Sequence, residues 1–177
     1  MEHRQSYTPE GFITLTLPTT GGIMTILDYN SSLKPVLEEM LVAYFPEVSS
    51  DIPEDIIRGK LLNLIHDQVS RRIIHISVGM LDDDPVGFSI YQIDREESDW
   101  CKYPGRGFIR EFYIRKEYRH RGYGTRLAAY TEEQLHLLGA ETLYLTTGDA
   151  DAFWVHCGYH NSGTICSNGL PVFTKNA

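Results

Sequence analysis

Residues 119–124 read Arg-His-Arg-Gly-Tyr-Gly, and this stretch decides how the rest of the chain is interpreted. It follows an apolar run at 108–114 and precedes a helical pattern that extends from 123 to 138. A strand, a glycine turn and a helix N-terminus in this order form an anion cradle, because the unpaired N–H groups of the first helical turn point outward and the helix dipole favours negative charge. The two glycines keep Cβ atoms away from a ligand that approaches the backbone. The stretch therefore predicts a phosphate-binding turn.

Basic residues gather around this turn although the protein as a whole is acidic. The chain carries a formal net charge of −8, which disfavours nonspecific nucleic-acid binding. Six of its 16 Lys and Arg residues nevertheless lie between positions 110 and 126: Arg110, Arg115, Lys116, Arg119, Arg121 and Arg126. This local positive charge favours a phosphate ligand over a plain turn.

Length and composition predict one cytoplasmic domain. The 177 residues, 42% of them hydrophobic, are enough for one buried core, which we place at 23–175 after an N-terminal extension at 1–21. The three cysteines, Cys101, Cys157 and Cys166, fit neither an even disulfide set nor a metal-ligand spacing. The N-terminus lacks the pattern of a signal peptide, and no apolar run reaches membrane-spanning length. We expect free thiols, no metal and no membrane partner.

The expected elements alternate between helices and strands. In chain order they are a strand at 23–27, helices at 31–45 and 51–66, a hairpin at 73–93, a strand at 107–115, a helix at 123–138, a strand at 142–146, a short helix at 149–156 and a hairpin over 162–174. We expect Ser31 or Ser32 to cap the first helix, and Asp51 with Glu54 to form a capping box on the second. The polar loop 94–106 contains Trp100 and is either functional or a solvated connector.

The order of these elements and two sequence segments resemble the GNAT family of N-acetyltransferases. The family's acetyl-CoA signature is Arg or Gln, two residues, Gly, one residue, then Gly or Ala, and Arg119, Gly122 and Gly124 match it. Residues 152–159 read Ala-Phe-Trp-Val-His-Cys-Gly-Tyr, which is similar to the family's Phe-Tyr-x-x-x-Gly-Phe segment. The resemblance covers about residues 23–175. It implies an α/β fold with a mixed, twisted central sheet of about six to seven strands and helices on both faces.

The resemblance also implies how acetyl-CoA is bound. Strands 107–115 and 142–147 should splay apart, with the pantetheine arm in the gap and the pyrophosphate on the N–H groups of 120–125. The backbone of Phe112 and Ile114 should pair with the pantetheine amides. The implied cofactor-binding residues are Phe112, Tyr113, Ile114, Arg119, His120, Arg121, Gly122, Tyr123, Gly124, Thr125, Phe153 and Trp154.

Catalysis in this family is direct attack of an amine on the thioester, which needs positioning and a general base. Glu111 is the candidate base, acting through water; the alternative is that it forms an ion pair with a nearby arginine. By strand parity Glu111 and Tyr113 share one face of their strand, whereas Phe112 and Ile114 share the other. This places the candidate base on a different face from the residues next to it.

The general acid is less well defined by the sequence. Trp154 stands where the family often has a tyrosine, and an indole N–H is not a useful proton donor at neutral pH. Tyr159 is the candidate in its place, with Tyr113, His156 or solvent as alternatives. We therefore keep Tyr159 beside Glu111 as a predicted catalytic residue.

The sequence thus predicts an acetyl-CoA-dependent N-acetyltransferase whose acceptor is the primary amine of a small molecule. The other partner considered is a second copy in a homodimer. Two alternatives stay open for the function: a non-catalytic acyl-CoA-binding module, suggested by Trp154, and a protein or peptide amine acetyltransferase. A nucleotide-binding protein is disfavoured because the chain has neither a P-loop nor a dinucleotide fingerprint.

Overall fold

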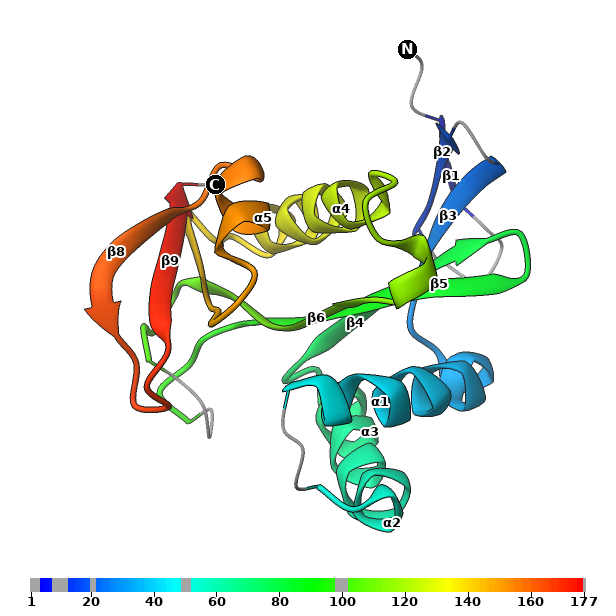
Figure 1. Cartoon of the computed structure of the whole chain (residues 1–177), viewed down its shortest axis with the longest axis horizontal. Helices are drawn as coiled ribbons and strands as arrows, with labels where there is room; N and C mark the ends of the chain where they lie inside the picture. Colours follow the sequence, from blue (N-terminus) through cyan, green and yellow to red (C-terminus); the bar gives the residue numbers. More distant parts are fainter. Residues whose placement is uncertain (1–3, 8–12, 20–21, 49–51, 98–101, 177) are drawn as a thin grey trace.

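The computed structural model describes residues 4–7, 13–19, 22–48, 52–97 and 102–176. They form one sheet with helices on both faces (Figure 1). The strands are β1 (Arg4–Tyr7), β2 (Ile13–Thr19), β3 (Gly22–Asp28), β4 (His75–Leu81), β5 (Asp84–Ile93), β6 (Gly107–Ile114), β7 (Thr142–Thr146), β8 (His160–Ile165) and β9 (Pro171–Asn176). The helices are η1 (Ser31–Leu33), α1 (Lys34–Val48), α2 (Glu54–Ile56), η2 (Ile57–Leu61), α3 (Leu62–Ser70), η3 (Lys116–Tyr118), α4 (Tyr123–Leu137) and α5 (Asp151–His156).

The strand order is β1-β2-β3-β4-β5-β6-β7-β9-β8. All neighbouring strands are antiparallel except β6 and β7, which are joined through α4 by a crossover. Helices α1, α2 and α3 cover one face of the sheet, and α4 and α5 cover the other (Figure 1). The predicted α/β fold with a mixed sheet is confirmed. The sheet has more strands than expected because β1 and β2, from the predicted N-terminal extension, continue its edge beyond β3.

Two helix starts differ from the prediction. The cap of η1 is Asn30, not Ser31 or Ser32: its side chain accepts a hydrogen bond of 2.9 Å from the N–H of Ser32. The next helix begins at Glu54 after Pro53 and has no side-chain cap. Asp51 lies outside the described residues. An asparagine next to two serines offers the same capping chemistry, so local sequence does not decide among them.

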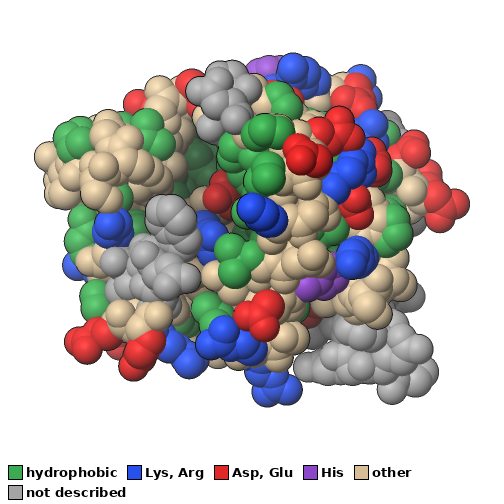
Figure 2. All heavy atoms as spheres, turned by 90° about the horizontal axis from the view of Figure 1, so that it is seen from below, with side chains coloured by type: hydrophobic (Ala, Val, Ile, Leu, Met, Phe, Trp, Pro, Cys, Tyr) green, Lys and Arg blue, Asp and Glu red, His purple; other side chains and the backbone are tan. Residues whose placement is uncertain are grey.

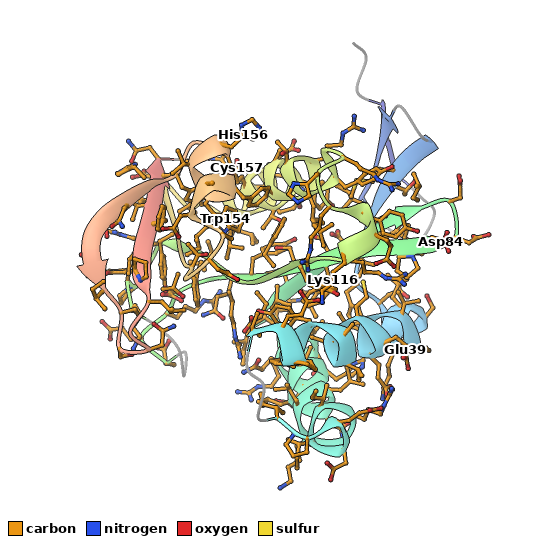
Figure 3. The ribbon with its side chains drawn as sticks, viewed as in Figure 1. Glu39, Asp84, Lys116, Trp154, His156 and Cys157 are labelled. Atoms are coloured by element: carbon orange, nitrogen blue, oxygen red, sulfur yellow. The ribbon has the colours of Figure 1, made fainter. Side chains whose placement is uncertain are left out.

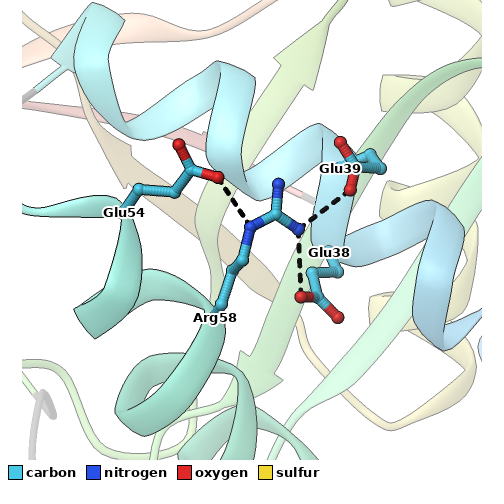
Figure 4. Close-up of polar contacts among 4 residues, drawn as sticks. All are labelled: Glu38, Glu39, Glu54 and Arg58. Carbon is cyan, nitrogen blue, oxygen red and sulfur yellow. Dashed lines mark hydrogen bonds and ion pairs between the residues drawn. The ribbon is translucent and has the colours of Figure 1, made fainter.

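A charged cluster fixes α2 and the π-helical turn η2 against α1 (Figure 4). The Nε of Arg58 donates to Glu54 at 2.7 Å, and its Nη1 donates to Glu38 at 3.0 Å and to Glu39 at 2.8 Å. The side chains of Arg58 and its partners are at least partly open to solvent, which weakens each ion pair. Together the pairs specify the position of α1, which carries residues that face the candidate site.

The base of the loop that connects β5 to β6 is built around one buried carboxylate. Asp94 accepts hydrogen bonds from the side-chain amide of Gln92 (2.8 Å), from the N–H groups of Lys102 (3.0 Å) and Tyr103 (3.2 Å), and from the hydroxyl of Tyr144. Asp94 itself is 1% exposed. This part of the loop is therefore ordered structure and not a solvated connector. Trp100 lies outside the described residues.

We expect Asp94→Ala to lower the free energy of unfolding by about 3 kcal/mol, because it leaves several buried donors without an acceptor. Chemical denaturation measures the effect. Glu96→Ala is the matched control, since Glu96 is an exposed carboxylate in the same loop and its loss should change stability by less than about 0.5 kcal/mol. Equal effects of the two substitutions would contradict this account of the loop.

Candidate active site

Strands β6 and β7 separate soon after they meet. They pair only at Gly107 with Leu143 and at Phe108 with Tyr144. The rings of Phe108 and Tyr144 stack at the last pair, with centroids 4.5 Å apart and planes 4° from parallel. Beyond that point β7 continues to pair with β9 as far as Thr146, whereas β6 pairs only with β5. The strands splay as expected, and one backbone edge of β6 faces the gap.

The turn between β6 and α4 leaves the helix N-terminus open. His120 and Gly122 have φ angles of 60° and 81°, in the left-handed region that glycine tolerates best. Gly122 occupies the cap position of α4, and no side chain caps the helix. Within the described chain, the backbone N–H groups of 120–125 donate to no carbonyl group. Such a set of outward-facing donors can bind an anion.

Gly124 brings the two motifs of the sequence together. A Cβ atom at this position would lie 3.1 Å from the ring of Phe153, which is tighter than ordinary packing. Phe153 stacks on Phe112 of β6 with ring centroids 5.7 Å apart, and Trp154 meets the same ring edge-on at 5.1 Å. Figure 3 shows Trp154 between α5 and the sheet. The first turn of α4, α5 and the second half of β6 therefore form one wall.

The side chain of Arg119 joins the turn to strand β6 and to α1. Its Nε donates to the carbonyl of Ile114 at 2.8 Å, and its Nη2 pairs with Glu47 of α1 at 2.8 Å. The guanidinium also lies over the ring of Tyr113, 5.6 Å from its centroid. It thus holds the turn against α1, and its cofactor-binding role stays a prediction. Arg121 is exposed and forms no ion pair with a described residue, so it is the available cation of the turn.

The other expected residues of the turn lie as follows. The side chains of His120 and Thr125 are exposed, so they contribute mainly through their backbone N–H groups. Tyr123 is buried and packs edge-on against Tyr118, with ring centroids 6.0 Å apart. Tyr113 donates its hydroxyl to Glu47 at 3.1 Å, and burial raises the pKa of this phenol to about 12. Tyr113 and Tyr123 therefore stabilise the turn from its two sides.

Glu111 lies on the α1 face of β6 and accepts a hydrogen bond from the hydroxyl of Tyr44. Burial raises the pKa of Glu111 above the ordinary range, while the Tyr44 hydrogen bond and then the charge of Arg110 oppose the shift. Glu111 forms no ion pair with a described residue, although the charge of Arg110 acts on it, so both the base role and the arginine-partner role stay open. A carboxyl group whose pKa is raised toward neutrality is suited to accept a proton.

Tyr44 was not predicted as a site residue, because in the sequence it belongs to the apolar stripe of its helix. Its ring does pack in the core, 5.6 Å from Phe88 and 5.5 Å from Tyr113 between centroids. Burial and the charges of Glu111 and Asp149 raise the pKa of Tyr44, so its hydroxyl stays protonated and donates. A buried tyrosine normally needs a hydrogen-bond partner for its hydroxyl. A tyrosine within an apolar stripe therefore indicates that a polar group lies nearby.

The structure does not bring Tyr159 into contact with Glu111. Tyr159 is 2% exposed and packs against Trp154, with ring centroids 5.3 Å apart, in the layer under α4 and α5. Its hydroxyl makes no hydrogen bond in the described structure, and burial followed by the charge of Glu132 raises its pKa. His156 is exposed and points away from the sheet (Figure 3). The acid role of Tyr159 stays a prediction.

The surface beside β8 and β9 is hollowed in the view of Figure 2, and an acidic side chain is visible within the hollow. In the described segments, no group of three or more His, Cys, Asp or Glu residues is placed to hold a metal ion. No helix there is long and apolar enough to cross a membrane.

Solved structures with the same fold include two that are complexes with coenzyme A. The PaiA N-acetyltransferase from Thermoplasma acidophilum, in complex with coenzyme A, is 18% identical with a TM-score of 0.67, over 87% of this chain and 99% of that chain. A GNAT-family acetyltransferase from Listeria monocytogenes is 12% identical with a TM-score of 0.67, over 92% and 99%. Aminoglycoside N-acetyltransferase AAC(6')-Iy with coenzyme A is 15% identical with a TM-score of 0.59, over 79% and 87%.

No curated protein matches this sequence. The model of the acetyltransferase (GNAT) family matches residues 35–159, which include α1, the splayed strand β6, the open turn and α5. With this match over most of its length, the chain belongs to the GNAT family of acetyltransferases.

Proposed function

We propose that the protein transfers an acetyl group from acetyl-CoA to the primary amine of a small molecule. The observation that carries the proposal is the separation of β6 and β7 next to an open helix N-terminus, with Glu111 on β6 held by a hydrogen bond from Tyr44 of α1. The gap fits an extended amide-containing chain, the helix end fits a pyrophosphate, and the carboxylate fits an amine.

The cofactor would lie along the unpaired edge of β6. The backbone of Phe112 and Ile114 would pair with the pantetheine amides in place of the missing strand. The pyrophosphate would sit on the N–H groups of 120–125, with Arg121 as the charged donor beside it. Phe153 and Trp154 would close the side of the gap toward α5. The coenzyme A complexes of two structures with this fold support this placement.

Glu111 would accept the proton of the acceptor's ammonium group through a water molecule. The neutral amine then attacks the thioester carbonyl carbon, a C–N bond forms, and the oxyanion is stabilised by a backbone N–H of β6. Collapse of this adduct breaks the C–S bond, and the remaining excess proton on the nitrogen passes to solvent or to the released coenzyme A thiolate, which leaves a neutral amide. A thiol has a pKa of about 8.5, so the thiolate is a fair leaving group even if Tyr159 does not act as acid.

The charges near the base favour a cationic acceptor. The carboxylate of Asp149, between β7 and α5, acts on the same tyrosine hydroxyl that binds Glu111. The negative charges of these two carboxylates would favour an ammonium group near Tyr44. The names of two proteins with this fold, PaiA N-acetyltransferase and an aminoglycoside N-acetyltransferase, support acetylation of an amine.

A screen for thiol release from acetyl-CoA with polyamines, aminoglycosides, amino acids and short peptides tests the proposal. Turnover with a small polycation and none with peptides supports it. A non-catalytic acyl-CoA-binding protein would bind coenzyme A in calorimetry and release no thiol with any amine. Preference for a peptide amine would support acetyl transfer and contradict the proposed small-molecule acceptor.

We expect Glu111→Gln to lower kcat/KM at neutral pH by about a hundredfold or more, because a general base contributes about 10²–10⁴. The acidic limb of the pH profile should disappear, and this limb in the wild type should lie above the usual carboxyl range because the pKa is raised. Affinity for coenzyme A, measured by calorimetry, should not change. An unaltered pH profile would remove Glu111 as the base.

Tyr44→Phe should move the acidic limb of kcat/KM to higher pH. The hydroxyl stabilises the carboxylate form of Glu111, so its loss raises the pKa of Glu111 and demands a higher pH for the active form. The plateau at high pH should be largely kept. Tyr29→Phe, which removes a tyrosine hydroxyl bound to His66, is the control and should leave the limb in place. A shift to lower pH would contradict the assignment.

Gly124→Val should weaken coenzyme A binding by about tenfold, because a side chain there collides with Phe153 and displaces the wall of the gap. The control is Gly59→Val, since a Cβ at position 59 meets nothing within 4 Å. Calorimetric titration with coenzyme A compares the two variants. Equal affinities would show that the contact between the two motifs does not shape the cofactor site.

A further inference from the structure

A second pocket, of about 260 Å³, lies at the end of the sheet where β3 ends and β4 begins. The ends of α3 and α4 flank it. Its polar lining comes from Asp28, Arg72, His75 and Gln134, and its apolar lining includes Leu137 and Leu138. None of these residues takes part in the acetyl-transfer site proposed above.

The pocket is separate from that site. Glu111 lies on the α1 face of the sheet, whereas Tyr91, which lines the pocket, packs in the layer under α4. The open turn is at the first residue of α4 and Leu137 is at its last, so the 15 residues of the helix put about 20 Å between them. A ligand in the pocket would therefore not occupy the acetyl-CoA cradle.

One side of the pocket carries a carboxylate with unused capacity. Asp28 accepts a hydrogen bond of 3.1 Å from the hydroxyl of Tyr130 and forms no ion pair with a described residue. A carboxylate can accept about four hydrogen bonds, so acceptor positions stay free. Burial raises the pKa of Asp28 more than the Tyr130 hydrogen bond, the nearby His75 and the hydroxyl of Ser77 lower it. A cationic group in the pocket would relieve that burial cost.

The lining also includes donors that are not used within the protein. The amide nitrogen of Gln134 is buried and has no hydrogen-bond partner, which is uncommon for a buried polar atom. Arg72 forms no ion pair within the described chain, and its charge reaches His75. Burial lowers the pKa of His75, so its ring stays neutral at pH 7 and adds no further charge. These donors suit an anionic acceptor such as a carboxylate.

The backbone at Arg72 has an unusual conformation. Its φ is 55°, and its N–H donates to the carbonyl of Val69 at 2.9 Å, which ends α3 in the way that normally favours glycine. The chain thus has an arginine in the pocket lining, at a position whose backbone conformation favours glycine. Leu137 and Leu138, 65% and 43% exposed, add an apolar surface beside it.

We propose that this pocket binds a small zwitterion with an apolar body, of the class of aliphatic α-amino acids. The ammonium group pairs with Asp28, the carboxylate with Arg72 and the amide of Gln134, and the aliphatic side chain lies against Leu137 and Leu138. Opposite charges in the lining of one pocket distinguish this class from a simple amine or a simple acid.

Three probes with the same apolar body test the charge requirement: leucine, isopentylamine, which lacks the carboxylate, and 4-methylpentanoate, which lacks the amine. Binding to the full chain is followed by calorimetry and by NMR shifts at pH 7. We expect leucine to bind and each analogue to bind at least about tenfold more weakly. No binding of leucine, or equal binding by an analogue, overturns the proposal.

Variants locate the site. Arg72→Gly removes the guanidinium at a position whose backbone suits glycine, so the melting temperature should not fall while leucine affinity drops about tenfold or more. Arg71→Gln is the control, because Arg71 is exposed, pairs with Asp67 and does not line the pocket. Asp28→Asn should also weaken the binding of leucine. Unchanged affinity in Arg72→Gly and Asp28→Asn overturns the assignment.

Glu111→Gln separates this proposal from the acetyl-transfer function. The variant should lose turnover and keep leucine affinity, whereas loss of leucine binding would place the amino acid in the acceptor site and overturn the second pocket. If the amine screen fails while leucine binds in an Arg72-dependent way, the pocket stands without the proposed transferase activity.

Discussion

The parallel contact between β6 and β7 is limited to two residue pairs, and the arrangement of the site depends on this limit. A register shift in the pairing of β5 with β6, between Ile90 and Tyr91, leaves Arg110 as an extra residue on β6. A bulge of this kind bends a strand and increases its twist. β7 pairs with β9 along its whole length, so it cannot bend together with β6 and keep its pairing with that strand. The edge of β6 therefore exposes backbone groups, and such groups need a partner.

Helix α1 couples the two halves of the site. Tyr44 donates to Glu111, and three residues later along the helix Glu47 binds both Arg119 and Tyr113. One helix thus holds the candidate base and the phosphate turn in a fixed relation. The salt bridges of Arg58 hold α1 itself in place against the following helices. A change in α1 would affect the base and the cofactor turn together, although neither motif of the sequence includes this helix.

The parts of the site that the sequence predicts are those made by local chemistry. The glycine turn at 119–124 and the face of Glu111 follow from backbone geometry and strand parity, and both are as expected. The parts that it misses depend on distant partners. The partner of Arg119 is Glu47, 72 residues earlier, and that of Glu111 is Tyr44, 67 residues earlier. No local pattern in the sequence connects residues so far apart.

The choice between an enzyme and a non-catalytic cofactor-binding protein can be argued from Glu111. A protein that only binds acyl-CoA needs the strand gap and the open turn, and it gains nothing from a carboxylate held in a poorly solvated place. Burial of a charged group costs free energy, and the raised pKa of Glu111 reflects that cost. The hydrogen bond from Tyr44 and the charge of Arg110 offset only part of that cost. A group that costs stability and is suited to accept a proton favours catalysis, even though Trp154 replaces the tyrosine expected in this family.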